Sequence, residues 1–294
     1  MINPSIKPMN GKTCLITGAT SGIGRVTARE LAAMGAQVII VGRNPQRCQE
    51  TVDTIRQETG NREVDFLLAD LSSQAQVRRI AEEFQKKVPS LNVLINNAGA
   101  VFMKRHTNLD GIEMTIALNH LSYFLLTSLL LECLKSSAPA RIVNVASDAH
   151  QGAKIDFDDL QGLHKYAGFR AYSQSKLANI LFTFELARRL EGSGVTANAL
   201  HPGFVSSNLA KNNGPLVRSA MKIAHLWAIS PEKGARTSVY LASSPEVEGV
   251  NGKYFVNEKE TQASPEAYNQ EVAHKLWEIS TILVGVSLAD KDIN

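Results

Sequence analysis

The stretch Lys12-Thr13-Cys14-Leu15-Ile16-Thr17-Gly18-Ala19-Thr20-Ser21-Gly22-Ile23-Gly24 decides the fold of this chain. Its first part, Lys12 to Thr17, is a short apolar run that predicts a buried strand, and the rest is a glycine turn. A helical pattern of apolar residues follows as far as Gly35, and Gln37 to Val41 predicts a second strand. A strand, a glycine turn, a helix and a strand within about 30 residues make a βαβ unit, in which such a turn binds a dinucleotide.

The glycines of this turn suit a phosphate ligand. They let backbone N–H groups approach a pyrophosphate at the helix N-terminus, where the helix dipole favours an anion. The spacing is G-x-x-x-G-x-G rather than the commonest G-x-G-x-x-G, and the alternative is a plain tight turn. Because a predicted strand and helix flank the turn, we expect cofactor contacts at Gly18, Thr20, Ser21, Gly22, Ile23 and Gly24.

The end of the second strand selects the cofactor. An NAD site places an acid there for the ribose 2′-hydroxyl, whereas this chain has Gly42-Arg43-Asn44. Arg43 could pair with a 2′-phosphate, and the alternative is a surface arginine at a strand end. The missing acid favours NADP(H), with Arg43 and Asn44 as contacts.

The alternation continues with a helix over 45–59, a strand over 64–69, a helix over 73–87 and a strand over 92–95. After the third strand, Asp70-Leu71 could accept the adenine amino group, or Asp70 could cap the next helix, a task for which Ser72 competes. The fourth strand ends in Asn96-Asn97-Ala98-Gly99, whose small and amide residues suit either close cofactor approach or turn formation. We expect cofactor contacts at Asp70, Leu71, Asn97, Ala98 and Gly99.

Two polar residues stand out in the next part of the chain. Asn119 lies in a long apolar helical region over 111–134, where a buried amide must be satisfied. It could bond a neighbouring strand or position a water molecule. Ser147 follows a fifth predicted strand over 141–146, a position where a serine is usually a helix cap or turn residue.

Tyr172 and Lys176 are four residues apart in an apolar helical pattern, so they project from one face. Tyr-x-x-x-Lys is common by chance as a solvated helix face. A free tyrosine has a pKa near ~10, and a cation ~4 Å away contributes ~4 kcal/mol at an effective dielectric constant of ~20. We therefore expect Lys176 to lower the pKa of Tyr172 by roughly 3 units if the site is partly dry.

The remaining segments complete the alternation. Residues 151–169 predict a solvated loop with three acids, and 195–200 predict a sixth strand that ends in His201-Pro202-Gly203. His201 fits a turn or core position better than a metal site. The segment over about 204–230 could be an apolar substrate lid or a surface helix. A helix over 231–242, a strand over 252–256 and a C-terminal helix over about 266–284 follow.

Composition excludes several classes of protein. The net charge is +3, from 31 basic and 28 acidic residues, which is too balanced for nucleic-acid binding. The three cysteines, Cys14, Cys48 and Cys133, form no metal or disulfide pattern and fit a reducing compartment. The apolar run over 121–134 is shorter than the ~20 residues of a membrane span, and residues 1–11 form a short polar tail. We expect a cytoplasmic protein with no membrane anchor and no metal.

Together these motifs resemble the short-chain dehydrogenase/reductase family, most closely its retinol dehydrogenase group. The resemblance rests on the glycine turn, on Asn96-Asn97-Ala98-Gly99, and on Asn119, Ser147, Tyr172 and Lys176 in the order of the catalytic tetrad. The long interval between Ser147 and Tyr172 and the run Tyr-Ser-Gln-Ser-Lys-Leu-Ala-Asn point to the retinol dehydrogenase group. The segment beside the nicotinamide corresponds to Pro202, Gly203, Val205 and Ser207.

The resemblance implies an α/β fold over residues 1–294, a single domain with a doubly wound (Rossmann), seven-stranded parallel sheet. It implies that Tyr172 is the general acid or base, that Lys176 lowers its pKa and holds the nicotinamide ribose, that Ser147 bonds the substrate oxygen, and that Asn119 holds a water molecule. The expected activity is NADP-dependent interconversion of an apolar aldehyde or ketone and its alcohol. A non-catalytic NADP(H) sensor and an epimerase of the same superfamily are the alternatives, and a homo-oligomer remains an open question.

Overall fold

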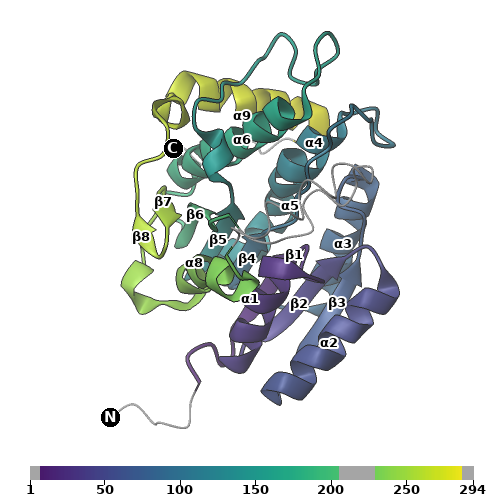
Figure 1. The fold of residues 1–294 in the computed structure, drawn as a ribbon. Helices are drawn as coiled ribbons and strands as arrows, with labels where there is room; N and C mark the ends of the chain where they lie inside the picture. Colours follow the sequence, from purple (N-terminus) through teal and green to yellow (C-terminus); the bar gives the residue numbers. More distant parts are fainter. Residues whose placement is uncertain (1–6, 205–228, 287–294) are drawn as a thin grey trace.

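One sheet runs through the molecule and separates two layers of helices (Figure 1). The computed structural model describes residues 7–204 and 229–286. In the sheet the strand order is β3-β2-β1-β4-β5-β6-β7-β8. The strands are β1 (Thr13–Thr17), β2 (Gln37–Gly42), β3 (Val64–Leu68), β4 (Val93–Asn96), β5 (Ala140–Val145), β6 (Val195–His201), β7 (Tyr254–Val256) and β8 (Lys259–Glu260).

Strands β1 to β7 are parallel, as the sequence predicts, and β8 is an additional antiparallel strand. The prediction of seven strands is therefore short by one. Strand β8 pairs with β7 across a two-residue turn, Asn257 and Glu258, whose φ angles are +51° and +64°. Such a hairpin turn needs both central residues in the left-handed region of backbone conformation. A glutamate at one of these positions gives no sequence signal for the turn.

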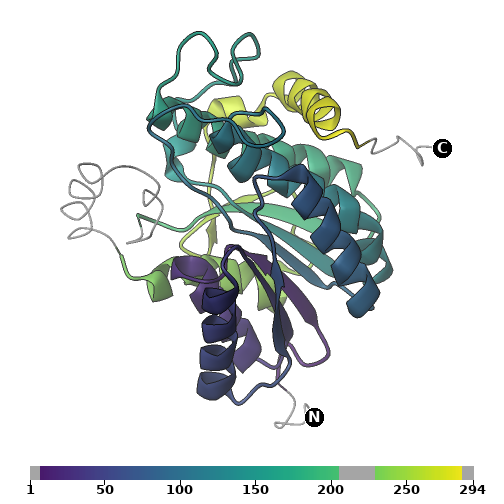
Figure 2. The same ribbon diagram turned by 90° about the vertical axis from the view of Figure 1, so that its right-hand side faces the viewer.

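Helices cover both faces of the sheet, and Figure 2 shows the two layers edge-on. One face carries α1 (Gly22–Ala33), α2 (Pro45–Thr59) and α8 (Pro231–Ser243), and the other carries α3 (Gln74–Lys87), α5 (Ser122–Ser136) and α6 (Gly168–Arg189). Helix α9 (Gln270–Val284) packs outside α6. It begins later than the helix predicted over about 266–284, because Pro265–Tyr268 form a separate 3-10 turn.

The order in which strands are added to the sheet reverses between β1 and β4, since β2 and β3 lie on one side of β1 and β4 to β7 on the other. In open α/β sheets the ligand binds outside the carboxyl ends of the strands at this switch point. The glycine turn follows β1 there, and Asn97-Ala98-Gly99 follow β4. The fold therefore brings the two predicted cofactor motifs together.

The apolar stretch around 121–134 belongs to a longer helical segment, Met114–Ser136. Short helix α4 (Met114–Ile116), a π-helical turn (Ala117–Leu121) and α5 form it. By length and composition this segment could cross a membrane, but 78% of its most apolar window is buried inside the fold. Its burial is that of a core helix, which is what the sequence predicts. The helical region predicted over 111–134 agrees with these bounds to within three residues, and only the apolar run over 121–134 taken alone is too short for a membrane span.

Residues 151–167 form an irregular excursion that projects from the top of the molecule (Figure 1 and Figure 2). This confirms the predicted loop. Of the predicted lid, only Phe204 and residues 229–230 are described, and the backbone N–H of Ile229 donates to the carbonyl of Phe204 at 2.8 Å. The predicted lid therefore lies almost entirely outside the described residues.

Candidate active site

The glycine turn has a shape that larger residues cannot adopt. Gly18 has a φ of +66°, and a Cβ added to it would lie 2.8 Å from the Cα of Ala98. A Cβ on Gly24 would lie 2.7 Å from the carbonyl oxygen of Gly18. Contacts this close to backbone atoms cannot be relieved by side-chain movement, so both positions require glycine. The turn leaves its backbone open at the N-terminus of α1, as a pyrophosphate needs.

The motif after β4 is fastened to β1. Asn97 donates from Nδ2 to the carbonyl of Thr17 at 2.8 Å, and its backbone N–H donates to Thr17 Oγ1 at 2.8 Å. The N–H of Ala98 shares the same hydroxyl at 3.0 Å. The side chain of Asn97 therefore has the structural role that was one of the two interpretations of the sequence. Thr17, which the sequence did not single out, holds the switch point together.

At the end of β2, Arg43 and Asn44 behave differently. The Arg43 side chain is 62% exposed, and its Nη1 lies 3.9 Å from Oδ2 of Asp70. Asn44 is the N-cap of α2, and its Oδ1 accepts from the N–H of Arg47 at 2.9 Å. Arg43 is available to an anion, whereas the side-chain oxygen of Asn44 is occupied by the helix.

Asp70 also has a local role. Its Oδ1 accepts from the N–H of Ser72 at 3.0 Å and from the hydroxyl of Ser72 at 2.7 Å. It precedes the N-cap of α3, which is Ser73. The carboxylate therefore shapes the turn before this helix and keeps Oδ2 towards Arg43. Leu71 beside it is buried.

The four residues predicted for catalysis converge from three parts of the fold. Lys176 donates from Nζ to the carbonyl of Val145, at the end of β5, at 2.9 Å. Ser147 follows that strand, and its hydroxyl is hydrogen-bonded to Tyr172. A Cβ on Gly99 would lie 3.5 Å from Lys176 Nζ and 3.4 Å from Asn119 Oδ1. Lys176 and Asn119 therefore both lie beside Gly99, in the loop after β4.

The amide of Asn119 is engaged with the loop after β4. Its Oδ1 accepts from the N–H of Ala100 at 2.9 Å, and its Nδ2 donates to the carbonyl of Ala100 and to the hydroxyl of Ser175, each at 3.0 Å. These bonds use both amide donors. The interpretation of Asn119 as a structural hydrogen-bonding residue therefore accounts for its side chain.

Burial controls the electrostatics of the pair on α6. It raises the pKa of Tyr172 to about 12, and the Ser147 hydrogen bond opposes this only in part. Burial also lowers the pKa of Lys176 to about 7. The expectation that Lys176 lowers the pKa of Tyr172 is wrong for this structure. Lys176 Nζ lies 5.7 Å from the centre of the tyrosine ring, and desolvation of both groups outweighs their attraction.

Tyr123 is a neighbour of this pair that the sequence analysis missed. Its ring centre lies 5.9 Å from Lys176 Nζ, and burial raises the pKa of its hydroxyl well above the usual value. Tyr123 stands four residues after Asn119 on the same helical segment. That spacing places the two on one face, and it is the signal that could have found Tyr123.

The structural alternatives considered for Ser147 and His201 are also realised. Ser147 is the N-cap of a short 3-10 turn and accepts from the N–H of Ala149 at 3.2 Å. His201 accepts at Nδ1 from the N–H of Asp148 at 3.0 Å, which joins the ends of β5 and β6. Within residues 7–204 and 229–286, no three histidine, cysteine or acidic residues gather where they could hold a metal ion.

The segment predicted to lie beside the nicotinamide is described in part. Gly203 has a φ of +87°, and a Cβ there would lie 2.6 Å from Cδ1 of Ile229. Pro202 precedes it at the end of β6. Val205 and Ser207 lie outside the described residues.

Comparison with known proteins agrees with this arrangement. A family model described as short chain dehydrogenase matches residues 12–216. Human retinol dehydrogenase 14 is 47% identical over 294 residues, which cover 95% of this chain and 88% of the relative. Human polyprenol dehydrogenase is 42% identical, with 97% of this chain and 88% of the relative covered.

Solved structures show the same fold. An uncharacterized protein from Mycobacterium paratuberculosis superposes with a TM-score of 0.79 at 34% identity, over 96% of this chain and 97% of that one. A Pseudomonas aeruginosa RhlG/NADP active-site complex has a TM-score of 0.68 at 28% identity, over 86% and 97% of the two chains. The matched family segment includes both the glycine turn and the Tyr172–Lys176 pair.

Proposed function

The chain belongs to the short chain dehydrogenase family, and from this premise we propose that it is an NADP(H)-dependent oxidoreductase that interconverts an apolar aldehyde or ketone and its alcohol. One observation carries the proposal. A buried tyrosine, hydrogen-bonded to Ser147 and next to Lys176 on α6, stands at the switch point beside a turn that only glycine can form. An acid, a charge-stabilising hydroxyl and a cofactor cradle are the parts that carbonyl reduction needs.

The residues at the switch point fit a dinucleotide, because Gly18 and Gly24 let the glycine turn pack closely against the loop after β4 and the turn leads into the N-terminus of α1, where a pyrophosphate is favoured. In this proposal the backbone of the glycine turn holds the pyrophosphate and Ala98 and Gly99 lie against the cofactor. When bound, NADP(H) supplies or accepts the hydride. In this proposal Lys176 also holds the nicotinamide ribose.

In this proposal Tyr172 donates the proton. With a pKa of about 12, its hydroxyl is protonated at neutral pH, which suits donation to the carbonyl oxygen of a substrate. Ser147 orients that oxygen and stabilises the charge that develops on it. In the reverse direction the same hydroxyl would have to be deprotonated. Carbonyl reduction also consumes one proton overall, so we propose that reduction is assayed best near neutral pH and that alcohol oxidation gains as the pH rises.

Three observations support NADP(H) over NAD(H). The chain has no acid directly after β2, where a ribose 2′-hydroxyl would be bound. Arg43 stands there instead, 62% exposed, and its distance of 3.9 Å from Asp70 is a weak contact that a phosphate would replace. The RhlG structure is an NADP complex.

The apolar substrate class and the location complete the proposal. Relatives of this chain are named as dehydrogenases of retinol and of polyprenol, two apolar alcohols, so a long apolar chain next to the reacting carbon is the expected substrate feature. The three cysteines are free thiols, which supports the reducing cytoplasm. Cell fractionation tests the location, and a salt-resistant membrane fraction would contradict it.

The decisive experiment is NADPH oxidation by the purified chain against a panel of aldehydes and ketones, repeated with NADH. We expect turnover with apolar carbonyl compounds and a preference for NADPH. Cofactor binding without turnover on any carbonyl compound would favour the sensor alternative, and equal use of both cofactors would contradict the assignment of Arg43.

A further inference from the structure

The loop after β4 touches the start of α6, the helix that carries Tyr172. A Cβ on Gly168, the first residue of α6, would lie 2.4 Å from the carbonyl oxygen of Phe102 and 2.5 Å from the Cα of Met103. Such contacts with backbone leave no room for a side chain. The absence of a side chain at Gly168 therefore lets the loop and the helix meet one turn before Tyr172.

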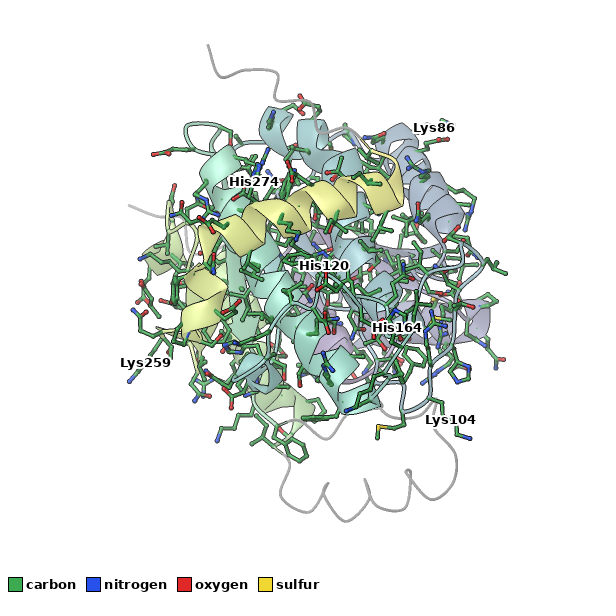
Figure 3. All side chains as sticks on the ribbon, turned by 90° about the horizontal axis from the view of Figure 1, so that it is seen from above. Lys86, Lys104, His120, His164, Lys259 and His274 are labelled. Carbon is green, nitrogen blue, oxygen red and sulfur yellow. The ribbon has the colours of Figure 1, made fainter. Side chains whose placement is uncertain are left out.

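Two large apolar side chains emerge beside this meeting point. Phe169 is 63% exposed and its ring centre lies 6.3 Å from that of Tyr172. Met103 is 45% exposed. The adjacent cation, Lys104, points outward from the molecule (Figure 3). Both side chains leave the fold at the contact between the loop and α6, and Phe169 lies beside Tyr172.

Tyr166, in the excursion before α6, fixes the loop on its other side. Its hydroxyl donates to the carbonyl of Phe102 at 2.7 Å and lies 3.1 Å from Oε1 of Glu113 and 3.2 Å from the hydroxyl of Thr115. Burial is the main cause that raises the pKa of this tyrosine to about 12. Tyr166 is therefore a neutral donor over the whole physiological range.

Glu113 connects this contact to the helix that carries Asn119. Its carboxylate is 2% exposed and accepts from the N–H groups of Thr115 at 2.8 Å and Ile116 at 2.9 Å, at the start of the helical segment. Asn119 then bonds Ala100. The loop is thus held at Ala100 by Asn119 and at Phe102 by Tyr166, and Met103 follows the second point directly.

We propose that the side chains of Met103 and Phe169 form an apolar surface, here called the wall, against which the apolar chain of the carbonyl substrate packs. Tyr166 is a positioning residue that holds this wall at a fixed place relative to Tyr172. The inference rests on the proposed function and adds the place where the apolar chain lies. The occupant is the unbranched or isoprenoid chain of an aldehyde or ketone. The hydroxyl of Tyr172 reaches the carbonyl end, and the aromatic ring of Phe169 packs along the chain.

The first test removes the wall. Phe169→Ala is compared with Ile282→Ala, which removes another exposed apolar side chain, on α9, that is 77% exposed against 63% for Phe169. The readout is the ratio of kcat/KM for decanal to kcat/KM for propanal. Because the wall removes the additional CH₂ groups of decanal from water, we expect Phe169→Ala to lower this ratio roughly tenfold and Ile282→Ala to leave it unchanged. An unchanged ratio in Phe169→Ala would overturn the wall, and would indicate that another part of the chain binds or covers the substrate.

The second test removes only the hydroxyl that holds the wall. Tyr166→Phe is compared with Tyr240→Phe, which removes an exposed tyrosine–carboxylate bond of 3.0 Å to Glu246, far along the chain. We expect Tyr166→Phe to raise KM for decanal about threefold to fivefold with a smaller change in kcat, and Tyr240→Phe to change neither. A lower melting temperature with an unchanged ratio of kcat/KM for decanal to kcat/KM for propanal would show that Tyr166 has only a structural role.

A third measurement separates failure of the wall from failure of the proposed function. Amide hydrogen exchange is followed with NADPH and decanol present, in the wild type and in Phe169→Ala. Protection of residues 102–104 and 168–170 in the wild type alone supports the wall even if no carbonyl compound is turned over. No protection in either protein would overturn it even if reductase activity is found.

Discussion

The cofactor cradle and the catalytic pocket lie side by side at the switch point but are built in opposite ways. The cradle, formed by the glycine turn, the end of β2 and Asp70, depends on backbone shape, and its charged side chains are exposed, 62% for Arg43 and 39% for Asp70. The pocket, formed by Asn119, Ser147, Tyr172 and Lys176, has side chains withdrawn from water, with Lys176 only 3% exposed. Backbone shape determines the properties of the cradle, and removal of side chains from water determines those of the pocket.

This difference sets the size of the electrostatic effects. An exposed pair such as Arg43 and Asp70 is screened by water and contributes little to stability. Removal from water, by contrast, moves the pKa of Lys176 to about 7 and that of Tyr172 to about 12. Substitutions in the pocket should therefore have larger effects than those in the cradle, and they should depend on pH.

The largest effect is expected for Tyr172→Phe. The phenyl ring preserves the packing of α6 but carries no proton, so kcat for carbonyl reduction should fall by about 10² to 10⁴. NADPH affinity should stay within a factor of about two, because the cradle is untouched. Single-turnover kinetics and cofactor titration measure the two quantities. Turnover close to that of the wild type would mean that another group supplies the proton.

The second prediction concerns the free energy of unfolding, which is lowered by removing the charged Lys176 side chain from water. Its folded-state pKa of about 7 lies below the usual 10.5, so between these pH values the unfolded chain binds a proton that the folded chain does not. The free energy of unfolding therefore rises with pH across this window. The penalty is fully present below about pH 7 and vanishes above 10.5. Lys176→Met removes it.

Denaturant unfolding of wild type and Lys176→Met at pH 6 and pH 10 tests this. The variant should gain stability relative to the wild type at pH 6, and the gain should shrink towards pH 10. Loss of the bond to Val145 lowers the stability of the variant at both pH values, so the quantity that tests the prediction is the pH dependence of the difference between the two proteins. The groups around the ammonium, Tyr172, Tyr123 and His201, are common to both proteins. A difference that does not vary with pH would show that Lys176 is not desolvated.

The cradle could largely be predicted from the sequence because its determinants are local. The positive φ of Gly18 arises within the glycine motif that predicts the turn, whereas Asn44, predicted as a cofactor contact, caps α2. The alternation of strand and helix patterns predicts the strands β1 to β7 along the chain, and the family resemblance implies that they form one parallel sheet. The antiparallel β8 is not predicted, since its turn contains Glu258 in a conformation that glutamate rarely adopts.

The pocket could be predicted as a set of residues but not as an electrostatic environment. The resemblance to a known family named Asn119, Ser147, Tyr172 and Lys176, and the fold brings them together. The pKa values depend on burial by distant segments, which no local pattern reports. The same holds for the π-helical turn at Asn119 and for the contact between Tyr166 and Phe102, which joins segments 64 residues apart.

A third, smaller effect is expected for Arg43→Ala. If Arg43 pairs with the 2′-phosphate, its loss should weaken NADPH binding by about tenfold, near the lower limit for a charge-assisted bond because the site is exposed. NADH binding should be unchanged. The control is Arg56→Ala, at the other end of α2, whose pairing with Asp53 at 4.0 Å is also exposed. Equal losses of affinity for NADPH and NADH would show that Arg43 does not contact the 2′-phosphate.

The smallest effect concerns Asn44, which the sequence predicts as a cofactor contact and which the fold uses as a helix cap. Its Oδ1 already accepts from Arg47 at 2.9 Å, so Asn44→Ala should lower the free energy of unfolding by about 1 kcal/mol. Asn44→Asp keeps an acceptor for the cap but adds a negative charge where the 2′-phosphate would lie. It should retain stability and bind NADPH less tightly than NADH. If Asn44→Asp instead leaves the preference for NADPH intact, the phosphate does not lie at the end of β2, and the cradle would then have to select its cofactor elsewhere.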